Sequence, residues 1–248
     1  MSRRSGMARP LGVRGHQKET HLISGNKVSK YCPVDGPNEG NHLLALDVDP
    51  RTVFIIPQPF TVRLDIRQKF QTRAEALRAE PRIRLTPVDE KNPLEKVYTP
   101  DFQVDCANPV NLIYEAKSQR EIHQIKPQID RRREVLNFLG FHYLVVPNED
   151  INQDGLRVNL VHLRDACKFK RANDATPYIK LLQDAIGDRQ DDFFWGEYKG
   201  RLSDLSLYLG LVCGLIACDL RAGPFGVNTK LWQSHGDLSH LQLLNWGI

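Results

Sequence analysis

The stretch that decides the fold is VYTPDFQVDCANPVNLIYEAK, which runs from Val97 to Lys117. It holds two strand-like runs, YTPDFQV and NLIYEAK, on either side of the turn-like segment DCANPV, and this pattern predicts a β-hairpin. If the turn centres near Asn108, the numbers of paired residues sum to about 216. Asp101 then lies opposite Glu115.

The same hairpin puts charged side chains in apolar surroundings, which costs free energy unless something pairs with them. Side chains alternate along a strand, so Glu115 and Lys117 share one face and Ala116 points to the other. Asp101, Glu115 and Lys117 are therefore expected to converge at one end of the hairpin. A Pro-Asp dipeptide or a Glu-x-Lys strand alone is usually structural, but the two at this spacing indicate a reactive site.

The residue types in this hairpin suit phosphodiester hydrolysis, which needs an activated water and relief of negative charge in the transition state. Hard divalent cations supply both, and carboxylate oxygens bind them. A lysine beside the metal orients or deprotonates the water and stabilises charge. The predicted ligands of Mg²⁺, for which Mn²⁺ can substitute, are Asp101 and Glu115, with the backbone carbonyl of Ala116 as a further oxygen donor.

An acidic residue further upstream extends this set. The Asp-Gly-Pro sequence at 35–37 predicts the start of a helix, and Asp49-Pro50 predicts its end. Glu39 falls in the first turn, on the same face as Leu43 and Leu46, and so on the core side. His42, on the same helix, is expected at the surface or beside the site.

Between this helix and the hairpin, the sequence predicts strands and an excursion. TVFIIPQPFTVRLDI, residues 52–66, contains two β-rich runs broken by Pro57 and Pro59. The segment 67–96 is rich in charge and proline, and a short helix is expected at 72–79 within it.

After the hairpin, a helix is expected from about Arg120 to Leu139, with a kink at Pro127 and a C-cap at Gly140. FHYLVVPN, residues 141–148, follows as an apolar strand. A strand, a helix and a strand after a hairpin predict a mixed α/β sheet. The helix is basic, so we expect it to lie along the DNA backbone, although a solvated face balanced by acidic neighbours is the plainer alternative. The candidate phosphate contacts are Arg120, Lys126, Arg131, Arg132 and Arg133.

The 248-residue chain, with a formal net charge of +4, is predicted to divide into three parts. Residues 1–30 carry seven Lys or Arg against one acid, which predicts a basic flexible arm that contacts phosphates or only aids solubility. Residues 31–164 contain the hairpin and its sheet. Residues 165–248 are expected to be mostly helical, with one helix from Leu202 to Leu220.

Nothing in the sequence predicts a membrane segment or a disulfide framework. The uncharged run Leu205 to Cys218 is shorter than the roughly 20 residues that cross a bilayer, so it is interpreted as a buried helix. The five cysteines are scattered, which favours a reducing compartment. The expected location is therefore the cytoplasm; the family resemblance described next further implies a bacterial, DNA-associated protein.

The pair TPDF and YEAK resembles the motif of the PD-(D/E)xK nuclease superfamily. More narrowly, the ordered set NEGNHLLALDVDPRTVFIIPQPFTV, YTPDFQV and LIYEAKSQ resembles the TnsA-type endonuclease subunit of heteromeric cut-and-paste transposases. The resemblance covers about residues 31–148, and the region after 165 is similar to that family only in its helical, winged-helix-like layout. It implies a restriction-endonuclease-like mixed sheet flanked by helices, with a smaller, mostly helical C-terminal docking domain.

The resemblance also implies a role for each matching residue. Glu39 is the early-helix acid, a metal ligand or water-positioning group. Asp101 is the central metal ligand, Glu115 the second strand ligand and Lys117 the catalytic lysine. Gln58 matches the Gln-Pro position, with a structural or auxiliary role.

The implied function is a Mg²⁺-dependent DNA endonuclease that cuts the 5′ ends of a transposon. The implied partners are the transposon-end DNA, a separate transposase subunit that cuts the 3′ ends, and an AAA+ transposition regulator that contacts the C-terminal domain. A stand-alone restriction or repair nuclease on the same fold is one alternative. A non-catalytic docking module is the other, and it predicts that Lys117→Ala changes nothing.

Overall fold

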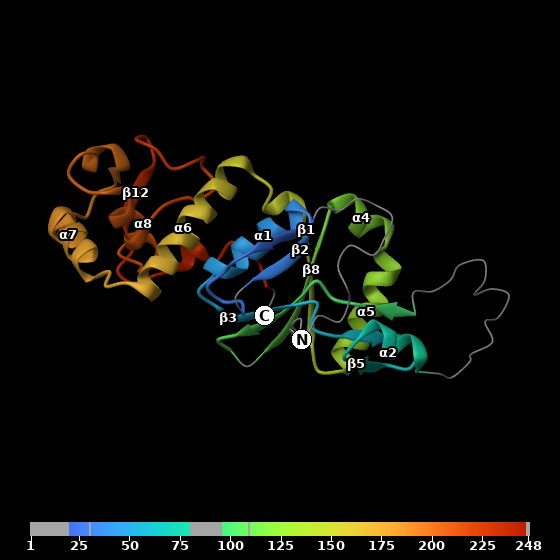
Figure 1. The fold of residues 1–248 in the computed structure, drawn as a ribbon. Helices are drawn as coiled ribbons and strands as arrows, with labels where there is room; N and C mark the ends of the chain where they lie inside the picture. Colours follow the sequence, from blue (N-terminus) through green and yellow to red (C-terminus); the bar gives the residue numbers. More distant parts are fainter. Residues whose placement is uncertain (1–19, 30, 80–95, 109, 247–248) are drawn as a thin grey trace.

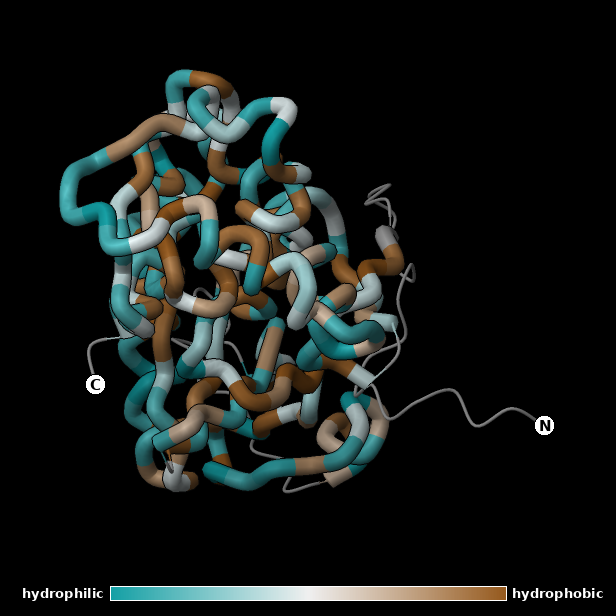
Figure 2. Tube along the Cα trace, turned by 90° about the vertical axis from the view of Figure 1, so that its left-hand side faces the viewer, coloured by the Kyte–Doolittle hydropathy of each residue, from teal (hydrophilic) through white to brown (hydrophobic). Residues whose placement is uncertain are grey.

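The computed structural model describes residues 20–29, 31–79, 96–108 and 110–246, and it shows a mixed α/β protein. Figure 1 shows two lobes joined along the helix α6 (Asp154–Ala172). The larger lobe contains the predicted hairpin, and the smaller lobe is formed by the C-terminal segment. Figure 2 is seen from the side of the smaller lobe. It shows hydrophobic residues in the interior and hydrophilic residues on many of the outer loops.

A four-stranded sheet within the described chain forms the centre of the larger lobe. Its order is β3-β7-β8-β9, with bounds β3 (Thr52–Pro57), β7 (Phe102–Cys106), β8 (Asn111–Lys117) and β9 (His142–Pro147). β7 and β8 are antiparallel, and Phe102 pairs with Tyr114, so the predicted register is confirmed. β8 and β9 are parallel, as the strand–helix–strand prediction requires.

The outgoing strand of the hairpin is shorter than predicted. Val97 and Tyr98 form β6 (Val97–Tyr98), which pairs with β4 (Thr61–Arg63) in a separate sheet that also contains β5 (Gln68–Phe70). Thr99 and Pro100 separate β6 from β7, and Pro100 has no amide hydrogen for a ladder. Asp101 therefore lies in the bend just before β7.

Helices cover both faces of the central sheet. One face is covered by α1 (Pro37–Val48), which in turn packs against α6, and the shared core includes buried side chains such as Leu43, Phe102 and Tyr114. The other face packs against α5 (Lys126–Phe138) and against the small sheet, which is the sheet of β4, β5 and β6, around Ile113 and Tyr143. The predicted helix at 35–50 is thus confirmed, with Glu39 in its first turn.

The other predicted elements of this lobe are also present. α2 (Arg73–Arg78) is capped by Thr72, and α4 (Gln119–Gln124) by Ser118. The helix expected to kink at Pro127 divides at Ile125, one residue before α5 begins. Gly140, after α5, has a φ of +82°, the left-handed conformation expected of a residue that ends a helix. Residues 80–95 of the excursion lie outside the described residues.

The smaller lobe contains helices and a short sheet. The helices are the end of α6, α7 (Thr176–Ile186) and α8 (Asp204–Val212). The sheet has the order β10-β12-β11, with bounds β10 (Phe193–Phe194), β11 (Ile216–Ala217) and β12 (Lys230–Gln233). Short 3₁₀ turns are η1 (Asn148–Asp150), η2 (Trp195–Tyr198) and η3 (Ser239–Leu241).

The helix predicted over 202–220 is wrong in length. It ends at Val212, and the chain reverses into β11. Gly214 has a φ of +69°, and a Cβ there would lie 2.9 Å from the carbonyl carbon of Gly236. Close packing of two backbones therefore stops the helix, although the apolar sequence continues.

Two elements of the structure lie at the predicted domain boundaries. Residues 20–23 of the predicted arm form β1 (Thr20–Ile23), which pairs with β2 (Cys32–Asp35), while residues 1–19 lie outside the described residues. The boundary at 164/165 falls inside α6, because its apolar side packs against both α1 and α8. In the described residues, no helix combines the length and apolar character needed to cross a membrane.

Candidate active site

The predicted site forms at one end of the central sheet. Asp101 precedes β7, and its Oδ2 accepts a hydrogen bond of 3.2 Å from the amide of Ala116 at the end of β8. The Gln58 amide donates to the Asp101 carbonyl at 2.9 Å, so the Gln-Pro segment holds the backbone of the site. The Lys117 Nζ lies 3.0 Å from Glu115 Oε1 and 3.6 Å from Asp101 Oδ2. The structure thus brings together the three side chains that the hairpin spacing predicted.

Glu39 approaches the same end of the sheet from α1. Its Oε2 accepts a hydrogen bond of 2.8 Å from the amide of Asp35, which fixes the side chain against the start of the helix. Burial, followed by the negative charge of Asp101, raises the pKa of Glu39 to about 7. The charge of Asp101 therefore disfavours ionisation of Glu39.

Lys117 remains an ammonium ion in this arrangement. Burial lowers its pKa, but the charges of Asp101 and Glu115 outweigh burial and raise the pKa above its ordinary value. Its Nζ also donates to the Ala116 carbonyl at 3.2 Å. Lys117 is thus placed to supply positive charge beside the carboxylates.

Glu115 is the most enclosed acid of the site, with only 3% of its surface exposed. Its Oε2 accepts hydrogen bonds from the hydroxyls of Tyr98, at 3.0 Å, and Tyr143. Arg132 Nη1 lies 2.9 Å from Oε1 and 3.0 Å from Oε2. Burial raises the pKa of Glu115, but the charges of Lys117 and Arg132 outweigh burial and lower it. Glu115 is therefore a carboxylate anion.

The structure places Arg132 differently from the sequence prediction. It was expected to contact phosphate, but it is 6% exposed, pairs with Glu115, and its guanidinium lies 4.4 Å from the centre of the Tyr98 ring. The spacing of Arg132 from Ile129 and Leu136, three and four residues away, is the sequence signal for a buried face. Tyr98 and Tyr143 were missed because they come from separate strands.

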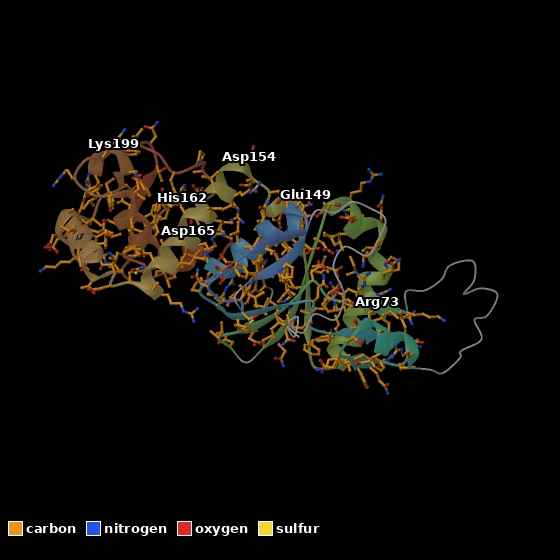
Figure 3. The ribbon with its side chains drawn as sticks, in the orientation of Figure 1. Arg73, Glu149, Asp154, His162, Asp165 and Lys199 are labelled. Carbon is orange, nitrogen blue, oxygen red and sulfur yellow. The ribbon has the colours of Figure 1, made fainter. Side chains whose placement is uncertain are left out.

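The remaining predicted phosphate contacts lie at or near the surface. Arg120, Lys126 and Arg133 are exposed and Arg131 is half-buried. Asp130 Oδ2 pairs with Lys126 at 2.6 Å and its Oδ1 with Arg133 at 3.2 Å. Glu149, labelled in Figure 3, accepts a hydrogen bond of 3.0 Å from the Gln119 amide, which ties the start of α4 to η1 beside the site.

The site suits a hard divalent cation in its chemistry. No three His, Cys, Asp or Glu side chains among the described residues are arranged to enclose a metal. Two carboxylates, from Glu39 and Asp101, lie with the carbonyl of Ala116 at one end of the sheet, and all are oxygen donors of the kind that Mg²⁺ prefers. Burial, and after it the charge of Asp101, raise the pKa of Glu39, and a divalent cation would offset both effects by stabilising the carboxylate anion. These three groups therefore fit the predicted metal.

His42 lies inside the protein rather than at its surface. It is completely buried, its Nδ1 contacts the Tyr114 hydroxyl, and its Nε2 lies 3.2 Å from Asn148 Oδ1. Burial lowers the pKa of His42 to about 4, with smaller and opposing effects from the charges of Lys117 and Glu149. His42 is therefore neutral in the folded protein.

We expect His42 to make the protein sensitive to mild acid. The unfolded histidine binds a proton below about pH 6.5, whereas the folded one does so only near pH 4, so its contribution is complete above pH 6.5 and is lost as the pH falls to 4. The expected loss of unfolding free energy across that window is roughly 3 kcal/mol. Urea unfolding at several pH values measures it. His42→Gln is the control and should have the shallower pH dependence; equal slopes would contradict the assignment.

Comparison with known proteins does not extend these observations: no protein-family model and no curated protein matches the chain.

Proposed function

We propose that this protein is a metal-dependent DNA endonuclease of the PD-(D/E)xK type. We propose further that it is the TnsA-like subunit of a heteromeric cut-and-paste transposase that cuts the 5′ ends of the transposon. The observation that carries the proposal is the placement of the Lys117 ammonium 3.6 Å from Asp101 and 3.0 Å from Glu115 at one end of a mixed sheet. Glu39 adds a fourth ionisable group from a separate helix.

The chemistry follows from the charges of these groups. Asp101, Glu39 and the Ala116 carbonyl would hold the cation, which when bound supplies an activated water and neutralises phosphate charge. Lys117 supplies a positive charge to the phosphate oxygens as negative charge develops in the transition state. The hydrogen bond from the Ala116 amide keeps the Asp101 carboxylate aimed at that position.

The resemblance to the transposase subunit supports the choice of partners. We propose that α4 and α5 lie along the transposon-end DNA, that a second subunit cuts the 3′ ends, and that the smaller lobe contacts an AAA+ regulator. The exposed basic side chains of Arg120 and Arg133 support the DNA contact. A restriction-endonuclease-like fold agrees with the mixed sheet and its flanking helices.

A crystal structure with Mn²⁺ and a DNA duplex tests the metal site. The expected anomalous peak lies between Glu39, Asp101 and the Ala116 carbonyl. Cleavage of transposon ends by this protein with its partner subunits tests the reaction, with Asp101→Asn as the inactive variant. Cutting of a duplex by the chain alone would favour the stand-alone nuclease. An Asp101→Asn protein that still supports 5′ cleavage would contradict a catalytic role.

The salt dependence of DNA binding tests the proposed DNA face. Each lost phosphate contact lowers the slope of log affinity against log salt by about 0.9. We therefore expect Arg120→Ala and Arg133→Ala each to reduce the slope by about that amount. Fluorescence anisotropy with a duplex at several salt concentrations measures it. Lys199, which is exposed on the far lobe in Figure 3, is the matched control, and Lys199→Ala should leave the slope unchanged.

A further inference from the structure

Both oxygens of the Glu115 carboxylate already accept hydrogen bonds from other groups of the protein. Its Oε1 faces Arg132 Nη1 at 2.9 Å and Lys117 Nζ at 3.0 Å. Its Oε2 accepts from the hydroxyls of Tyr98 and Tyr143 and lies 3.0 Å from Arg132 Nη1. A carboxylate offers about four lone-pair directions, and these contacts occupy them.

The electrostatic setting of Glu115 also disfavours a metal. Two cations, Arg132 and Lys117, already touch a carboxylate that is 3% exposed, and a divalent ion at the same oxygens would meet their repulsion. Asp101 is less enclosed, because 13% of its side chain is exposed against 4% for Glu115, and Lys117 lies farther from it, at 3.6 Å. The site thus contains one acid enclosed by donors and another in a more open position.

The side chains that donate hydrogen bonds to Glu115 are fixed in place by packing inside the protein. Tyr98 lies on β6, Tyr143 on β9 and Arg132 on α5, and all three are buried. The Tyr98 and Tyr143 rings meet edge to face with centres 6.1 Å apart, and Arg132 stacks on Tyr98 at 4.4 Å. This packing leaves the Glu115 carboxylate little freedom to turn away from Lys117.

We infer that Glu115 positions Lys117 rather than binding the metal, and that Arg132, Tyr98 and Tyr143 hold Glu115 in place for that task. The inference rests on the proposed function, since it assigns roles within the same nuclease site. The sequence predicts that Glu115 binds the metal; in this inference Glu115 instead holds Lys117 through a hydrogen-bonded ion pair. The metal ligands are then Asp101, Glu39 and the Ala116 carbonyl.

Mn²⁺ binding to the full chain, measured by calorimetry with a DNA duplex present, separates the two roles of Glu115. Losing a group that holds a metal ligand in place costs about 10–100-fold in affinity or activity, and losing the ligand itself costs at least as much. In this inference Glu115 contacts Lys117, which is not a metal ligand, so neither cost applies to Mn²⁺ binding by Glu115→Gln. We expect Asp101→Asn to weaken Mn²⁺ binding by about tenfold or more, and Glu115→Gln to stay within about twofold of the wild type. Cleavage by the reconstituted transposase should fall in both.

Variants of the surrounding donors test the positioning role. We expect Arg132→Met to retain Mn²⁺ binding while cleavage falls by about 10–100-fold, with partial rescue in Arg132→Lys. Tyr98→Phe combined with Tyr143→Phe removes two hydroxyl donors but keeps the rings, so it tests the role even if Arg132→Met fails to fold. Glu134→Gln, an exposed acid on the same helix as Arg132, is the matched control and should change neither readout.

The outcomes are distinguishable. Loss of Mn²⁺ binding in Glu115→Gln equal to that in Asp101→Asn would make Glu115 a ligand and overturn the inference while the proposed function stands. Unchanged cleavage in the double tyrosine variant would also overturn it. A wild-type protein that binds no Mn²⁺ with the duplex present would overturn the proposed function and the inference together.

Discussion

Replacing Lys117 with methionine is expected to lower the rate of 5′-end cleavage by about 10²–10³-fold, the cost typical of removing one group that stabilises charge in the transition state. The ammonium lies between Glu115 and Asp101, and methionine keeps much of its length while removing the charge. Single-turnover cleavage of a labelled transposon end by the reconstituted complex measures the effect. Mn²⁺ binding should persist, because the oxygen donors remain.

Two further variants show whether the loss of cleavage is specific to the charge of Lys117. Lys117→Arg keeps a positive charge and should retain part of the rate, whereas Lys199→Met, in the far lobe of Figure 3, should cleave like the wild type. Cleavage by Lys117→Met at the wild-type rate would support a docking module that retains the fold without its chemistry. That outcome would refute the nuclease proposal directly.

The largest loss of stability is expected for Phe102→Ala. Phe102 is 1% exposed, it belongs to the hydrophobic core that also contains side chains of α1 and α6, and the centre of its ring lies 6.3 Å from that of Tyr114. Removing a buried phenylalanine ring leaves a cavity and costs about 3–5 kcal/mol of unfolding free energy. Urea denaturation measures this loss as a lower midpoint.

Val53→Ala is the matched control for this change. Val53 lies on the adjacent strand β3 but is 58% exposed, so its truncation should change the unfolding free energy by no more than about 0.5 kcal/mol. Because Phe102 follows Asp101 directly, we also expect Phe102→Ala to disturb the active site. Equal effects of the two substitutions would show that the central sheet is not the stable core.

The sequence predicted the hairpin because its information is local. The turn between two strands sets the register, and the two-residue period of a strand sets the faces, so Asp101, Glu115 and Lys117 could be brought together on spacing alone. The same reasoning failed at Leu202 to Leu220. Apolar residues continued there past Val212, but close backbone packing at Gly214 ended the helix.

The sequence by itself therefore determined the central elements and the members of the site that the hairpin carries. Only the tertiary structure decided the surroundings of Glu115, because Tyr98, Arg132 and Tyr143 come from segments that meet only when α5 and the small sheet pack on the same face. Whether Arg132 contacts solvent or a buried acid depends on that packing. A basic helix alone does not encode which of its charges is covered.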